Sequence, residues 1–128
     1  MADSRNRRYD LEERTATFGE AVVRFAKQLP MSPVVTPLIS QSVRAGTSVG
    51  ANYIEADDAH TKKEFLQKIS TCKKEAKETK HWLRMIAAAT PENRAGAREL
   101  WQKAKELHLV FAAICHSAKV WLLDFVLS

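Results

Sequence analysis

Four segments of the chain carry apolar or small residues at alternating steps of four and three, and only short breaks separate them. On a helix this spacing places the apolar residues on one face, which neighbouring helices must cover. The pattern predicts helices over about 11–29, 35–59, 62–86 and 91–127. The short connections predict an all-α, up-down-up-down antiparallel four-helix bundle over residues 10–128, preceded by a flexible segment, residues 1–9.

Local residue choices agree with these breaks. Pro30 ends the first segment, and either Ser32 or Thr36 is suited to cap the second. Thr61 followed by Glu64 has the spacing of a capping box at the start of the third helix. Thr90 before a proline predicts the N-cap of the fourth helix.

Composition places the chain among single-domain globular proteins. Its 128 residues are 45% hydrophobic and 27% charged, which suits one packed core. Cys72 and Cys115 lie within helical patterns without a CxxC spacing, so we expect free thiols in a reducing compartment. No signal-like or membrane-spanning run occurs in the sequence, and we expect a cytoplasmic protein with no membrane role.

The net charge of +5 is concentrated in one stretch. Residues 61–86 contain eight basic and three acidic residues. On a helical wheel most of the bases fall within about 120° and the acids lie on the adjoining flank, whereas a merely solvated helix intersperses them. Two interpretations remain open: a lysine face that maintains solubility, and a surface that binds RNA or DNA phosphates. The candidate nucleic-acid-binding residues are Lys62, Lys63, Lys73, Lys77, Lys80 and Arg84, with Arg44 as a weaker candidate.

A line of polar residues follows the second predicted helix. Arg44, Ser48, Asn52 and Glu55 are spaced by four, four and three, and Glu75 of the third helix is a candidate partner for Arg44. We call these five residues the polar seam. It is either a structural element that fixes packing register or part of a ligand site, and the small neighbours Gly46 and Gly50 favour close helix packing.

The second half of the last helix is apolar on more than one side, which indicates burial against a second copy of the chain. Scattered exposed aliphatic residues are the alternative. The candidate oligomer interface residues are Leu109, Ala113, Val120, Leu123 and Leu127.

Catalytic and metal-binding patterns are missing from the sequence. The four histidines form no HxxxH pair, and no glycine-rich phosphate loop occurs. The simplest interpretation of Trp82, Trp101 and Trp121 is that they are core or interface aromatics. We therefore expect a protein that is not an enzyme and has no cofactor.

Three stretches of the chain resemble the family named for proteins encoded in intervening sequences of bacterial 23S ribosomal RNA. They are YDLEERTATFGEAVVRFAKQLP at 9–30, SVRAGTSVGANYIEA at 42–56 and KKEFLQKISTCKKEAKETKHWLRMI at 62–86. Ala56 departs from the family pattern, in which glycine is common. The resemblance implies a left-handed four-helix bundle and a ring-shaped homopentamer. The chain is also similar to accessory proteins of diversity-generating retroelements, which are thought to handle RNA with a reverse transcriptase.

Two functional hypotheses follow from these observations. The first is a non-enzymatic oligomeric bundle that binds nucleic acid, with RNA favoured, through the basic face of the third helix. The alternative is a ring-shaped scaffold that binds a protein partner and has no nucleic-acid role.

Overall fold

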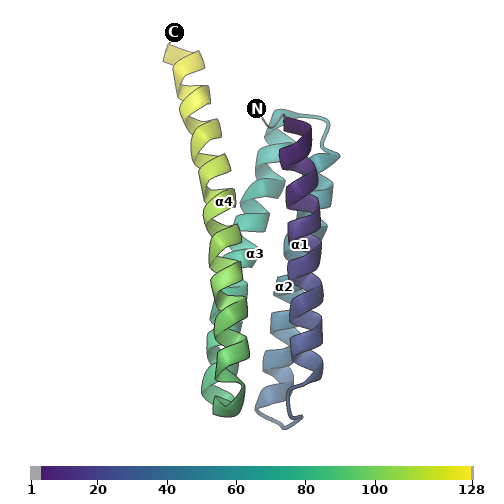
Figure 1. The fold of residues 1–128 in the computed structure, drawn as a ribbon. Helices are drawn as coiled ribbons and strands as arrows, with labels where there is room; N and C mark the ends of the chain where they lie inside the picture. Colours follow the sequence, from purple (N-terminus) through teal and green to yellow (C-terminus); the bar gives the residue numbers. More distant parts are fainter. Residues whose placement is uncertain (1–3, 128) are drawn as a thin grey trace.

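A computed structural model describes the backbone of residues 4–127 and the side chains of residues 10–119. It contains the helices α1 (Ser4–Lys27), α2 (Val35–Asp57), α3 (Lys62–Ala89) and α4 (Arg94–Leu127), with a short 3-10 helix, η1 (Pro91–Asn93), before α4. The helices alternate in direction and pack side by side, and α4 continues past the other three at its C-terminal end (Figure 1). The predicted all-α four-helix bundle is confirmed.

The ends of the helices follow the predicted caps at two of three places. Ser32 Oγ accepts a hydrogen bond from the Val35 amide at 3.1 Å, at the start of α2. Thr61 Oγ1 accepts one from the Glu64 amide, also at 3.1 Å, at the start of α3. Thr90 occupies the predicted N-cap position before Pro91, but of η1 instead of α4. Its hydroxyl makes no cap bond and donates to the Ile86 carbonyl at 2.8 Å.

Helix α1 begins at Ser4, several residues before the predicted start. The flexibility expected of residues 1–9 remains a prediction, since those side chains lie outside the described residues.

The core consists of apolar residues from all four helices. Phe111, Ile69, Leu83 and Val49 are fully buried. The Tyr53 ring is buried and lies 6.1 Å from that of Phe111, whereas its neighbour Asn52 is half-buried at the edge of the helix pair. Tyr53 is therefore part of the core, whereas Asn52, a member of the polar seam, is not.

Close approach of α1 and α2 depends on glycine. A Cβ atom added at Gly46 would lie 3.0 Å from both methyl groups of Val22, and one at Gly50 would lie 3.4 Å from Thr15. Gly46 and Gly50 thus have the packing role that their spacing predicted.

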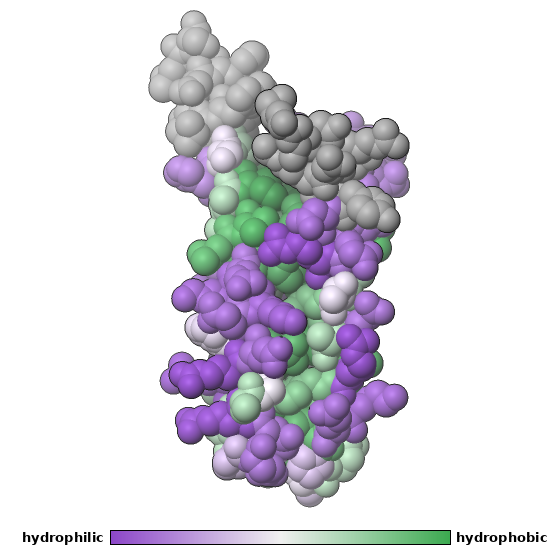
Figure 2. All heavy atoms as spheres, viewed as in Figure 1, coloured by the Kyte–Doolittle hydropathy of each residue, from purple (hydrophilic) through white to green (hydrophobic). Residues whose placement is uncertain are grey.

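Packing is uneven around the bundle. Helix α3 packs extensively against both α2 and α4, while α1 packs mainly against α2 and only sparsely against α4. In the view of Figure 1, apolar surface is visible along the line where α1 and α4 meet, between flanks of hydrophilic side chains (Figure 2). The extensive packing of α3 against α4 fixes the positions of the residues on the surface of this helix pair.

Candidate nucleic-acid interface

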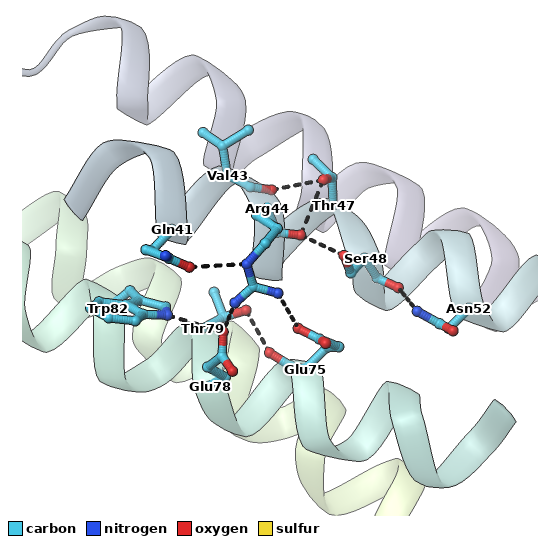
Figure 3. A network of polar contacts seen from close by, with 10 residues as sticks. All are labelled: Gln41, Val43, Arg44, Thr47, Ser48, Asn52, Glu75, Glu78, Thr79 and Trp82. Atoms are coloured by element: carbon cyan, nitrogen blue, oxygen red, sulfur yellow. Dashed lines mark hydrogen bonds and ion pairs between the residues drawn. The ribbon is translucent and has the colours of Figure 1, made fainter. Parts of the chain in front are cut away.

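Two of the three acidic side chains of α3, Glu75 and Glu78, face α2, where one arginine engages them (Figure 3). Arg44 Nη1 lies 3.3 Å from Glu75 Oε2, and Arg44 Nη2 forms an ion pair with Glu78. Gln41 Oε1 accepts a further bond from Arg44 Nε at 3.0 Å. The Arg44 side chain is 46% exposed, and that of Glu75 is only 14% exposed. The guanidinium thus neutralises carboxylates of its own chain, which reduces its capacity to bind an external phosphate.

The rest of the polar seam continues along the surface between α2 and α3. Ser48 Oγ donates to the Arg44 carbonyl at 2.6 Å, and Asn52 Nδ2 donates to the Ser48 carbonyl at 2.8 Å. Glu55 Oε2 pairs with Lys68 Nζ at 2.7 Å and raises the pKa of that lysine. Ion pairs at both ends of the seam therefore link α2 to α3, and the seam lies at the surface of the single chain.

A row of four α3 bases lies on the opposite flank, toward α4, whereas Lys68 pairs with α2. Lys80 Nζ is 5.4 Å from the centre of the Trp101 ring of α4, and the Lys73 carbonyl is 3.2 Å from His108 Nδ1. Arg84 lines a groove between the two helices together with Arg98. The α3 row consists of Lys73, Lys77, Lys80 and Arg84, at steps of four, three and four.

Helix α4 contributes a second row with the same steps in the antiparallel direction. Its members are Arg94, Arg98, Trp101 and Lys105. We call the surface between the two rows the α3/α4 groove. The hollow between Arg84 and Arg98 has a volume of about 630 Å³ and a floor of small residues, including Ala87, Ala88 and Ala97. Its described lining contains no carboxylate.

The seven cations of the two rows have no acidic partners among the side chains of residues 10–119. They are Lys73, Lys77, Lys80, Arg84, Arg94, Arg98 and Lys105. Like charges gathered on facing helices repel one another and weaken the helix pair. Binding of an anion between the rows would relieve this repulsion.

Lys62 and Lys63 lie elsewhere. They line a separate shallow hollow at the start of α3, together with Gln67 and Ser70. The structure thus brings four of the six α3 candidates into one row and leaves two at the N-terminal end of the helix.

Sequence analysis missed the contribution of α4, although a signal for it was present. The steps from Arg94 to Lys105 repeat those from Lys73 to Arg84. Two such rows face each other only if the helices are antiparallel and in the observed register. Trp101 is also not simply a core aromatic, because its ring contacts the core on one side and lines the groove on the other.

The candidate oligomer residues on α4 lie on its outer surface where they are described. Leu109 is 56% exposed and Ala113 is exposed. The side chains of Val120, Leu123 and Leu127 lie outside the described residues.

A second apolar surface, not foreseen from sequence, lies between α1 and α2. Ala16, Val23 and Ile54 line this α1/α2 groove, and Ile54 is 57% exposed. Its rim carries three carboxylates, Glu12, Glu13 and Glu20.

No three of the histidine, cysteine, aspartate and glutamate residues described here are grouped closely enough to hold a metal ion. None of the helices, over their described residues, has the length and hydropathy needed to cross a bilayer.

Comparison with known proteins places these features in a family context. Residues 7–113 match the family model described as "23S rRNA-intervening sequence protein". A crystal structure of a protein with unknown function from the S23 ribosomal protein family of Bacteroides thetaiotaomicron superimposes with a TM-score of 0.72 at 26% identity. That match covers 82% of this chain and 97% of the other. No curated protein gives a significant sequence match.

Proposed function

We propose, from the premise that this chain belongs to the 23S rRNA-intervening sequence protein family, that it is a non-enzymatic protein that binds nucleic acid in the α3/α4 groove. The observation that carries the proposal is the double row of seven cations without acidic partners. From Lys73 to Arg84 the row is about 16 Å long by the helical rise. Phosphates bound along it would release counterions, so affinity should fall steeply with salt.

The location of the acids supports the same proposal. Glu75 and Glu78 are held by Arg44 on the far flank of α3 and so do not neutralise the groove. A surface that served only solubility gains from mixed charges, because opposite charges one turn apart stabilise a helix. The separation of bases from acids forgoes this stabilisation of the helix, and binding of a polyanion would explain the separation.

RNA is the favoured nucleic acid, because the sequence motifs are similar to those of accessory proteins of diversity-generating retroelements, which are thought to handle RNA. Free thiols at Cys72 and Cys115 suit the reducing cytoplasm, where we place the protein.

Charge reversal tests the proposal. The variant Lys77→Glu, Arg84→Glu, Arg98→Glu changes three exposed groove cations, and its matched control, Arg24→Glu, Lys27→Glu, Lys103→Glu, makes the same net change elsewhere. Fluorescence anisotropy with labelled RNA at several salt concentrations should show at least a hundredfold loss for the groove variant and a shallower salt slope. The control should lose much less. Equal affinities for the two variants would place the binding surface outside the groove.

We further propose that the protein forms a homo-oligomer, with the pentamer as the expected form from the family resemblance. Two exposed apolar surfaces support it: the outer face of α4 at Leu109, and the α1/α2 groove. A second copy that inserts α4 into the groove would bury both surfaces.

The alternative function is a ring-shaped scaffold for another protein, and the α1/α2 groove favours it, because exposed apolar grooves also bind partner helices. A pull-down from lysate treated with nuclease discriminates between the two. A partner that remains after nuclease treatment, with no binding of purified RNA, would favour the scaffold.

A further inference from the structure

The geometry points to single-stranded nucleic acid as the ligand of the α3/α4 groove, with an unpaired base stacked on the Trp101 indole between the two rows of cations. The inference rests on the proposed function and specifies the class of ligand. It assigns a binding role to an aromatic residue for which the sequence pattern predicted only packing.

The Trp101 indole lines the α3/α4 groove and offers a flat surface on which a base can stack. Its ring is partly buried against the core and also lines the hollow that Arg84 and Arg98 share. Lys80 Nζ and Lys105 Nζ lie 5.4 and 5.7 Å from the ring centre, within the range of a cation–π contact. These ammonium groups end flexible four-carbon chains, so they can turn from the ring to neighbouring phosphates when a base takes their place.

The floor of the hollow leaves room beside the indole. Ala87, Ala88 and Ala97 present only methyl groups where longer side chains would fill the space. Arg84, Arg94 and Arg98 surround the hollow with planar guanidinium groups, which bind phosphates and also stack on bases. An aromatic platform within a cationic groove is the arrangement by which proteins hold single strands.

A duplex does not fit this arrangement as well. Its bases are stacked on one another inside the helix, so only its phosphates can reach a side chain on a convex helical bundle. A duplex would contact the rows of cations and leave Trp101 unused. Affinity for single strands should therefore depend on Trp101, and affinity for duplexes should not.

Trp82 provides an internal control. It is also half-buried on α3, but its Nε1 donates to Glu78 Oε2 at 3.1 Å, and its ring packs edge-on against His81 at 5.0 Å. Trp82 is therefore held beside the Glu78–Arg44 ion pair, away from the two rows of cations. Substitution of Trp82 removes an indole of similar exposure from the acidic flank of the same helix pair.

The experiment compares Trp101→Leu, Trp101→Phe and Trp82→Leu by anisotropy with short single-stranded RNA, single-stranded DNA of the same sequence, duplex RNA, and an RNA strand with abasic sites. Leucine keeps apolar bulk and removes the ring, while phenylalanine keeps a ring. We expect Trp101→Leu to weaken binding to both single strands by roughly tenfold to a hundredfold. Binding to the duplex and to the abasic strand should change less than twofold, Trp101→Phe should recover most of the affinity, and Trp82→Leu should match the wild type.

A second measurement does not depend on a variant that loses the ring. In Trp82→Phe, Trp121→Phe, the remaining Trp101 reports directly on its environment, and stacking should quench its fluorescence with single-stranded but not with duplex RNA.

The outcomes separate the two proposals. If the wild type binds none of the probes, the proposed function fails and the stacking site with it. If it binds both single strands and duplex, and Trp101→Leu binds single strands as well as the wild type, nucleic-acid binding stands and the stacking site is overturned. Equal losses for single strand, duplex and abasic strand would also overturn it, because they would indicate a general packing defect.

Discussion

At the scale of single residues, Cys72 shows how the core controls chemistry. Its side chain is fully buried, and its Sγ lies 3.5 Å from the Val49 carbonyl. Burial disfavours the thiolate and raises the pKa of Cys72 to about 12. Because the thiolate is the nucleophile, the buried thiol is inert in the native protein.

We predict that the buried thiol of Cys72 makes the stability of the protein depend on pH. An unfolded thiol ionises at about pH 8.5. Between that pH and about 12 the native state therefore retains a proton that the unfolded state has released. Stability should therefore decline as pH rises through this window, by up to about 1.4 kcal/mol per pH unit. Urea unfolding of wild type and Cys72→Ala at pH 8 and pH 10 isolates the effect, because lysines and tyrosines titrate in both. An identical decline in the two proteins would contradict the prediction.

At the scale of helices, the space available for a methyl group between α1 and α2 differs from one glycine to the next. A methyl group at Gly46 meets the branched side chain of Val22 at 3.0 Å, whereas one at Gly19 meets the Gly46 carbonyl and Thr47 at an ordinary 3.6 Å. Both residues lie within helices, where alanine is intrinsically favoured over glycine by about 1 kcal/mol. The space around the new methyl group therefore decides whether a glycine-to-alanine substitution stabilises or destabilises the protein.

We expect opposite effects from two similar variants. Gly46→Ala should destabilise the protein by roughly 1–3 kcal/mol, because Val22 or the helix backbone must shift. Gly19→Ala should be neutral or stabilising by up to about 1 kcal/mol. Urea midpoints, with circular dichroism to confirm helix content, measure both. Equal effects of the same sign would show that the two helices adjust freely at this contact.

The helices themselves were largely predictable, because each must bury one face and the apolar spacing records that face. The buried side of α3, from Ile69 to Ile86, is the clearest case. The cap at Thr90 was not predictable in the same way, since a threonine hydroxyl can bond forward to an amide or back to a carbonyl.

The candidate site was only half predictable. The row on α3 is visible in sequence because its residues share one helix face. The row on α4 can be recognised as part of the site only because Lys80 contacts Trp101 across the helix pair. The register between α3 and α4 is a tertiary property that spacing within one helix does not show. Likewise, spacing alone cannot show that the carboxylates of α3 bind Arg44 and leave the bases without partners.

At the scale of the whole molecule, the apolar surfaces of a single chain remain unexplained without a second copy. Leu109 on α4 and Ile54 on α2 are each more than half exposed. Exposed aliphatic residues that gather in grooves commonly mark interfaces.

We predict that the purified protein is an oligomer and that Leu109→Glu lowers its mass, because a buried carboxylate without a partner strongly disfavours association. Light scattering measures the absolute mass. Val34→Glu, at an aliphatic residue 67% exposed in the connection between α1 and α2, makes the same chemical change away from α4 and should leave the mass unchanged. A monomeric wild type would remove the interface on α4.

The sorting of charge by α3 also makes the molecule electrostatically two-sided. The α1/α2 groove has a rim of carboxylates, and the α3/α4 groove, on the other side of the bundle, has two rows of cations. A polyanion that approaches from any direction is turned toward the cationic side before contact, which accelerates productive encounters. If the proposed complex forms, its association rate should carry most of the salt dependence, and its residence time should be set by contacts made after docking, including the proposed base stacking.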